Sequence, residues 1–150
     1  MIPDRERSRA DIVARTGIDE AMIARLVHGF YDRVRADPVL APIFAAHIPD
    51  ERWPMHLGRM CAFWSSVALM TGDYHGRPMQ AHQPLAVEAS DFDRWLMLFR
   101  ATAHDLTPAA AAEHFIERAE RIAASLEYGI EAFQKRSLGR AGGLQLPAMQ

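Results

Sequence analysis

The sequence predicts an all-α protein built from one domain. Apolar residues recur at intervals of three and four positions through several segments, which is the spacing of amphipathic helices. Pro, Asp, Ser or Thr stands where most of these segments begin, and no run of alternating β-branched residues bounded by turns is present. The 150 residues, 49% hydrophobic and 24% charged, fit a single globular domain and exclude a disordered chain.

The first predicted helix spans roughly residues 19–36, and a short second helix follows it. Asp19 and Glu20 supply the acidic residues that a first helical turn prefers. Asp37-Pro38 stops this helix and opens the next, because proline suits the first helical position, and Pro42 limits the length of the second. The apolar positions of the two helices are Ile23, Val27, Phe30, Val34, Val39, Leu40, Ile43 and Phe44.

Another helix is predicted from Pro49-Asp50 to the Gly72-Asp73 pair, followed by a loop at 74–78. One face of this helix carries a histidine among large apolar groups, namely Trp53, His56, Met60, Phe63 and Val67. The segment 79–83 is then cut off by Pro84. So short a segment gains little from helix formation alone and needs something to pack against, such as a cofactor.

Two longer helices are predicted in the second half of the chain. Ser90 and Asp93 form a weak capping box before the first, and Thr107-Pro108 is expected to cap the second. From Gly139 onward we expect a loose tail. The apolar stripes comprise Phe92, Trp95, Leu96, Phe99 and Ala103 in the first, and Phe115, Ala119, Ile122, Leu126, Ile130 and Phe133 in the second.

Charge and cysteine content exclude several classes of protein. The formal net charge of -2 gives no reason to expect nucleic acid or an anionic membrane surface as a partner. Cys61 is the only cysteine, so a disulfide framework or a cysteine-rich metal site is excluded, and a cytoplasmic location is expected. The N-terminal stretch lacks the apolar core of an export signal, and the longest apolar run, at 67–70, is too short to cross a membrane.

Four residues are candidates for chemistry, although each also fits a structural role. None of the seven histidines has a second histidine four residues away, so the helical zinc-protease pattern is absent. No glycine-rich phosphate loop or serine-nucleophile turn is present either. His82 lies in the short Pro-bounded segment, His56 on a buried helix face, and Tyr31 and Trp95 on apolar stripes, where aromatic residues usually belong to the core.

Taken together, several segments resemble one family, the truncated haemoglobins, and in particular its third group. The resemblance covers roughly residues 20–130, with order and spacing in agreement throughout. The segments that carry it are 30–31 (FY), 37–44 (DPVLAPIF), 53–56 (WPMH), 63–64 (FW), 72–82 (GDYHGRPMQAH) and 92–99 (FDRWLMLF).

The resemblance implies a two-over-two helical sandwich around haem, with the globin domain at 19–137, an N-terminal extension at 1–18 and a flexible tail at 138–150. It implies His82 as the iron ligand and Tyr31, His56 and Trp95 as polar residues on the distal side. Arg59 and Arg77 are the expected partners of the haem propionates. The expected pocket walls are Phe30, Phe44, Met60, Phe63, Trp64, Met79 and Phe99.

The chemistry expected from this set is the binding of dioxygen, nitric oxide, carbon monoxide or peroxide on haem b. A neutral imidazole is a suitable axial ligand, and covalent attachment is excluded because Cys61 stands alone. Tyr31 can donate an O–H and Trp95 an N–H to a ligand that carries partial negative charge, and His56 can add a contact or act as a gate.

Several donors over one ligand favour slow release, which suits redox chemistry on nitric oxide or peroxide better than transport. A nitric oxide dioxygenase or peroxidase-like activity would need a separate reductase, because the chain contains no flavin or nicotinamide motif. Two alternatives remain open from the sequence: a haem-based gas sensor or oxygen-binding module without turnover, and a helical interaction domain without a cofactor.

Overall fold

The computed structural model describes residues 4–71 and 87–144, and over these residues the chain is helical without any β-strand. The predicted all-α class is confirmed. Arg77, Met79 and His82, and the predicted loop and short segment around them, lie outside the described residues. The elements in order are α1 (Asp4–Thr16), α2 (Glu20–Ala36), α3 (Leu40–Ala45), the 3-10 turn η1 (Asp50–Arg52), α4 (Trp53–Leu69), α6 (Ala89–Leu106) and α7 (Ala109–Leu144).

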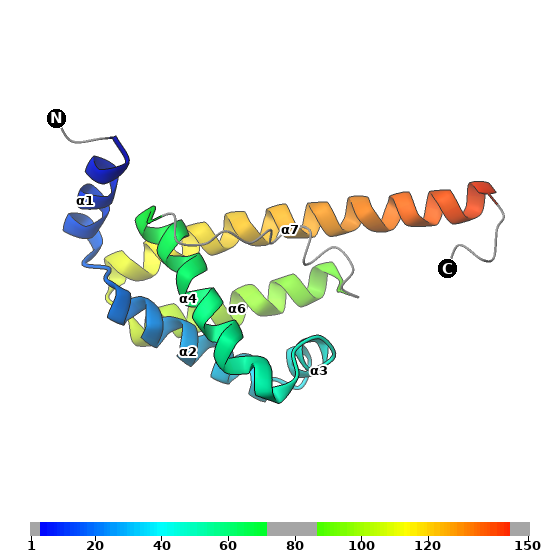
Figure 1. Ribbon diagram of the computed structural model, residues 1–150, viewed down its shortest axis with the longest axis horizontal. Coiled ribbons are helices and arrows are strands. Elements are labelled where there is room, and N and C mark those ends of the chain that lie inside the picture. Colours follow the sequence, from blue (N-terminus) through cyan, green and yellow to red (C-terminus); the bar gives the residue numbers. More distant parts are fainter. Residues whose placement is uncertain (1–3, 72–86, 145–150) are drawn as a thin grey trace.

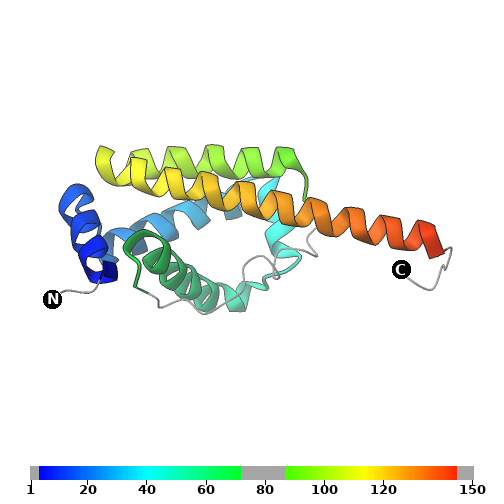
Figure 2. The same ribbon diagram turned by 90° about the horizontal axis from the view of Figure 1, so that it is seen from above.

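Two pairs of helices form the body of the molecule. α6 and α7 lie side by side in both views of the ribbon (Figures 1 and 2), and α2 packs against both α4 and α6. α3 lies at the end of α2, close to α6. This arrangement is the two-over-two sandwich that the resemblance implies.

An aromatic core joins the four main helices. Phe30 of α2, Phe99 of α6 and Phe115 of α7 are each almost fully buried. The indole of Trp64 on α4 stacks on Phe99, with ring centroids 5.0 Å apart and an interplanar angle of 18°. Burial of side chains this large is the main stabilising contribution here, at roughly 1.5 to 3 kcal/mol for each phenylalanine.

Capping differs from the sequence prediction at both ends of α6. The helix begins at Ala89, and the capping box pairs Glu88 with Asp91, so the predicted box at Ser90 is wrong by two residues. The Thr107 hydroxyl donates to the carbonyl of Ala103 at 2.6 Å. It therefore ends α6 instead of capping α7, because a hydroxyl that donates back to position i−4 satisfies a carbonyl at the C-terminus of the preceding helix.

α4 ends at Leu69, earlier than the predicted stop at Gly72, with Met70 in the left-handed conformation at φ 57°. Basic side chains from other helices satisfy its last carbonyls. Arg9 donates to the carbonyl of Leu69 at 3.1 Å, and the carbonyls of Val67 and Ala68 accept from Arg118 and His114 of α7 at 3.3 and 3.1 Å. The cationic side chains of Arg9 and Arg118 also interact favourably with the dipole at this helix C-terminus.

Both ends of the described chain are helical. α1 packs against α4 and α7 and buries Ile12, so much of the expected extension belongs to the folded body. α7 continues as a helix to Leu144 and extends well past the other helices (Figure 1), although a loose tail is predicted from Gly139. Once a helix exists, each further residue adds a hydrogen bond without a new nucleation cost.

Among the described residues, no helix is both long enough and apolar enough to cross a membrane.

Candidate ligand-binding pocket

A cavity of about 420 Å³ lies between α2, α3, α4, α6 and α7. Its volume is within the range of roughly 300 to 1,000 Å³ typical of small-molecule and cofactor sites. Most of the side chains that line it are apolar or aromatic, with a few polar groups among them. The lining comprises Tyr31, Leu40, Ile43, Phe44, His47, Ile48, His56, Arg59, Met60, Phe63, Trp64, Val87, Asp91, Phe92, Trp95, Ile122, Ala123 and Leu126.

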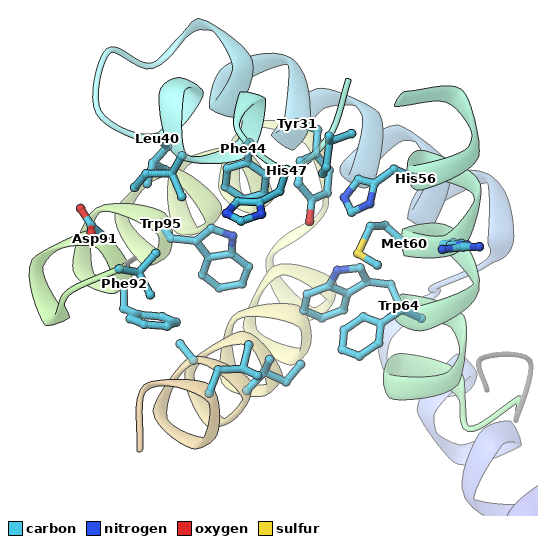
Figure 3. Close-up of a pocket in the computed structure, with 18 residues that line it drawn as sticks. Tyr31, Leu40, Phe44, His47, His56, Met60, Trp64, Asp91, Phe92 and Trp95 are labelled. Atoms are coloured by element: carbon cyan, nitrogen blue, oxygen red, sulfur yellow. The ribbon is translucent and has the colours of Figure 1, made fainter. Parts of the chain in front are cut away.

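Tyr31 reaches the cavity from α2 and is 6% exposed. Its hydroxyl points into the cavity (Figure 3), and its ring packs edge-on against Phe30 at a centroid distance of 5.1 Å. Burial raises the pKa of Tyr31 well above its ordinary value of 10, because the charged phenolate would lose its hydration. The side chain therefore keeps its O–H and can donate a hydrogen bond at neutral pH.

Trp95 enters from α6 and lies in the cavity across from Met60 (Figure 3). Its indole is held between two core phenylalanines: it stacks on Phe99 at 5.5 Å and meets Phe30 edge-on at 5.3 Å. An indole N–H can only donate a hydrogen bond. Tyr31 and Trp95 thus bring two donors from different helices to one mostly apolar space.

α4 supplies the opposite wall through His56 and Met60, which lie one turn apart and so face the same side. The half-buried His56 ring meets Tyr31 at 5.4 Å and Trp53 at 5.2 Å, both edge to face. Arg59, on the same helix, is exposed at the edge of the cavity. α4 therefore contributes both polar and apolar groups to the lining.

Most of the described residues that the resemblance assigns to the site meet around this cavity. They are Tyr31, Phe44, His56, Arg59, Met60, Phe63, Trp64 and Trp95. Phe30 and Phe99 are different, because they do not line the cavity but lie in the core directly behind Tyr31 and Trp95. The remaining three, Arg77, Met79 and His82, are outside the described residues.

The structure also adds residues that the sequence analysis did not assign to the site. His47, in the turn after α3, reaches the cavity beside Phe44 (Figure 3), and Asp91 and Phe92 line it from the first turn of α6. Phe92 lies three residues before Trp95, so the helical period could have placed it on the same face. His47 lies in a turn, so no helical period indicates from the sequence which way its side chain points.

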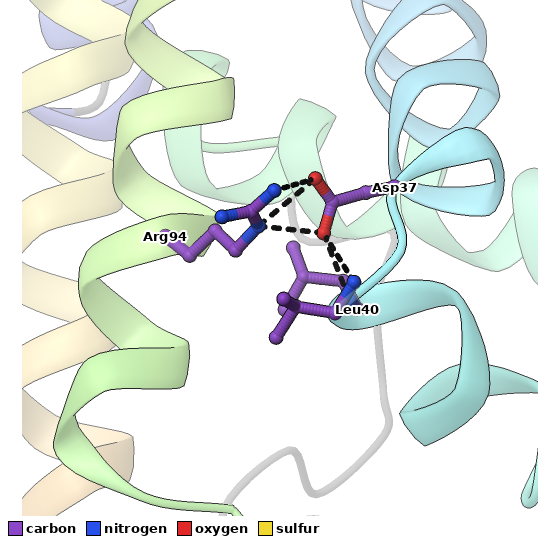
Figure 4. Close-up of polar contacts among 4 residues, drawn as sticks. Asp37, Leu40 and Arg94 are labelled. Atoms are coloured by element: carbon purple, nitrogen blue, oxygen red, sulfur yellow. Dashed lines mark hydrogen bonds and ion pairs between the residues drawn. The ribbon is translucent and has the colours of Figure 1, made fainter.

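A half-buried ion pair lies beside the cavity, between the α2–α3 corner and α6 (Figure 4). Both carboxylate oxygens of Asp37 accept hydrogen bonds from the guanidinium of Arg94, at 2.7 to 2.9 Å. These bonds, together with those from the backbone N–H groups of Leu40 and Val39, lower the pKa of Asp37 to about 2, although burial acts in the opposite direction.

Comparisons with known proteins agree with this fold. The family model for bacterial-like globins matches residues 14–127. The chain is 33% identical over 113 residues to a group 3 truncated haemoglobin of Campylobacter jejuni, which covers 73% of this chain and 89% of that protein.

Solved structures are similar as well. A crystal structure of group III truncated haemoglobin from Campylobacter jejuni matches with a TM-score of 0.70 and 32% identity, covering 75% of this chain and 91% of that one. A thermostable haemoglobin from the actinobacterium Thermobifida fusca matches with a TM-score of 0.61 and 29% identity, covering 71% and 89%.

The family match spans the whole cavity lining, whereas most of α1 and the far part of α7 lie outside it. The resemblance noted in the sequence is confirmed, and both comparisons point to the same group. This chain belongs to the bacterial-like globin family, among the truncated haemoglobins of the third group.

Proposed function

We propose that the protein binds haem b in this cavity and uses it to hold dioxygen or a related diatomic ligand. The observation that supports the proposal is that two hydrogen-bond donors, the Tyr31 hydroxyl and the Trp95 indole N–H, belong to residues that line a cavity made mainly of apolar side chains. When bound, the haem would supply the iron that binds the ligand and undergoes redox change.

The residues present fit such a group. A porphyrin is a flat apolar ring with two carboxylates at one edge, and the cavity combines aromatic and aliphatic walls with cationic or neutral nitrogen donors at Arg59 and His47. We propose Arg59 as a propionate partner from its place at the cavity edge. His82 as iron ligand and Arg77 as a second propionate partner are proposed from the family resemblance, since both lie outside the described residues.

In this chemistry, the role of the protein's own side chains is to retain a polarised ligand. Tyr31 is protonated at neutral pH, and burial, which raises its pKa further above 10, reinforces this. Its hydroxyl can therefore donate, and the Trp95 indole N–H can only donate, so both groups can stabilise a ligand with partial negative charge. In a water-poor pocket each such donor adds about 1 to 3 kcal/mol of binding. Retention of this kind favours redox chemistry on nitric oxide or peroxide, with electrons from a separate reductase.

Absorption spectra of the purified full chain test haem binding. The wild type should show the Soret band of bound haem, with distinct ferric, ferrous and carbon monoxide-bound spectra. His82→Ala should lose haem affinity and alter the ferrous spectrum, whereas the matched variant His104→Ala, at an exposed position on α6, should retain both. Unchanged affinity and spectra in His82→Ala would remove that residue as the ligand.

Rapid mixing with nitric oxide tests the redox proposal. The oxygen-loaded protein should convert nitric oxide to nitrate in stoichiometric amount, and a reductant should restore the ferrous protein for further turnovers. A wild type that binds oxygen but leaves nitric oxide and peroxide unreacted would contradict this part and favour the gas sensor.

A further inference from the structure

Asp37 connects three helices at one point. Its backbone N–H donates to the carbonyl of Val34 at 3.1 Å and so ends α2. Its Oδ2 accepts from the backbone N–H groups of Val39 and Leu40, at 3.1 and 2.9 Å, and so satisfies donors at the start of α3. The contact with Arg94 adds α6, because both carboxylate oxygens also accept from the guanidinium (Figure 4).

The contact with Arg94 is directional. Nε of Arg94 lies 2.9 and 2.7 Å from the two oxygens of Asp37, and Nη2 lies 2.7 Å from Oδ1. The Asp37 side chain is 6% exposed and that of Arg94 34%, so water screens the pair only from one side. Charge-assisted bonds to a planar guanidinium define an orientation as well as an energy.

Asp37 binds the start of α3 and Arg94 belongs to α6, and both helices form part of the cavity wall. α3 contributes Leu40, Ile43 and Phe44 to the lining, and α6 contributes Asp91, Phe92 and Trp95. Arg94 directly precedes Trp95, so the two side chains leave the helix about 100° apart. Holding Arg94 at the α2–α3 corner therefore constrains the rotation of α6 about its axis, and with it the direction from which Trp95 enters the cavity.

We propose that the ion pair between Asp37 and Arg94 positions Trp95, setting where its indole N–H points relative to a ligand in the cavity. This inference depends on the proposed function in one respect only, namely the identity of the ligand that the indole N–H would contact. Asp37 and Arg94 are absent from the cavity lining, so their effect on a ligand would pass through Trp95 and the α3 wall.

Packing of Trp95 against Phe99 and Phe30 is the competing explanation for its position. Ring contacts of this kind hold the plane of the indole, with a 14° angle to Phe99. They are weakly directional within that plane, because a stacked pair can slide at little cost. The ion pair supplies the missing constraint, since it holds the backbone from which the indole projects.

The test uses the full haem-loaded chain with carbon monoxide as the probe. A donor N–H near the probe's oxygen shifts the C–O stretching band, so Trp95→Phe defines the band without that donor. Arg94→Gln leaves the Asp37 bonds to Val39 and Leu40 available and removes only the charged fork. Arg100→Gln is the matched control, because Arg100 makes an exposed ion pair from the same helix with Glu120.

Arg94→Gln should shift the band toward that of Trp95→Phe and should speed oxygen release about three- to tenfold through the weakened donor. The double variant Arg94→Gln/Trp95→Phe should match Trp95→Phe alone, because both changes act through one indole. Arg94→Lys should give a smaller shift than Arg94→Gln, since an ammonium keeps the charge but loses the planar fork. Arg100→Gln should match the wild type.

Two results would overturn the proposal: a wild-type band in Arg94→Gln, or a shift in the double variant that is the sum of the two single shifts. The indole ¹H–¹⁵N signal of Trp95, identified by its loss in Trp95→Phe, provides a second readout that needs no bound probe. It should move in Arg94→Gln and not in Arg100→Gln. A wild type without a haem spectrum would contradict the proposed function, and the indole signal would still decide the positioning role.

Discussion

Tyr31 and His56 meet edge to face beside the cavity, with ring centroids 5.4 Å apart and an interplanar angle of 82°. One ring comes from α2 and the other from α4, and both side chains line the cavity. A change of the His56 rotamer would therefore alter a contact of the hydroxyl-bearing ring. The two residues are expected to contribute separably to ligand kinetics: Tyr31 to release and His56 to entry.

Tyr31→Phe should speed oxygen release by about one to two orders of magnitude, which corresponds to the loss of one donor at roughly 1.5 to 3 kcal/mol. The substitution removes only the hydroxyl and keeps the ring contacts. Carbon monoxide is less polarised when bound, so its release should change far less. Stopped-flow measurement of both dissociation rates checks this, and an oxygen rate equal to or slower than that of the wild type would assign the donor role to Trp95 or His56.

His56→Leu should change the association rate of carbon monoxide, because His56 lines the cavity, contacts the rings of Tyr31 and Trp53, and is only half-buried. We expect entry to become faster, since leucine loses the polar ring through which His56 would act as a gate. Laser photolysis gives the rate directly. His104→Leu, at an exposed position on α6, is the control, and equal rates in wild type and His56→Leu would exclude the gate.

Asp37→Asn should lower the free energy of unfolding at pH 7 by about 1 to 3 kcal/mol, because hydrogen bonds to a charged group are lost. The pKa of Asp37 falls from 3.8 to about 2 on folding, so the unfolded chain binds the proton more readily. The stabilisation is therefore complete above about pH 4 and disappears as the pH falls toward 2. Urea unfolding at pH 7 and pH 2.5 should show the gap between wild type and variant closing, and a constant gap would contradict the linkage.

His114 should make the fold less stable as the pH falls below about 6.5. Burial lowers its pKa from the ordinary value of 6.5, although the bond from Nε2 to the carbonyl of Ala68 acts in the opposite direction. The unfolded chain then binds more protons, so stability is present above pH 6.5 and is lost through the mildly acidic range. His114→Gln keeps a donor for Ala68 and should weaken this dependence.

Urea midpoints at pH 7.5 and 5.5 measure the effect of His114. The exposed His104 provides the matched variant, His104→Gln, which should retain the full pH dependence of the wild type. Equal dependence in the wild type and His114→Gln would show that other groups cause the acid sensitivity.

Local pattern in the sequence predicted α2, α3, α4, α6 and α7, although it gave no helix where α1 lies. The stripe Ile23, Val27, Phe30 and Val34 predicts α2, and all four residues are buried. The period of apolar residues depends only on residues that are close in sequence, so it can be recognised without knowledge of the rest of the fold. Helix ends were predicted less well, since Glu88 and Thr107 act in ways that depend on where the flanking backbone turns.

The tertiary structure alone decided which side chains face the cavity and which lie behind it. Phe30 and Tyr31 are adjacent in sequence, yet one belongs to the core and the other lines the cavity, because the rotation of α2 against α4 and α6 separates them. Asp37 and Arg94 are 57 residues apart, and no pattern in the sequence indicates that they form a pair. Their pairing depends on how whole helices pack, and that is set by the summed burial of many side chains.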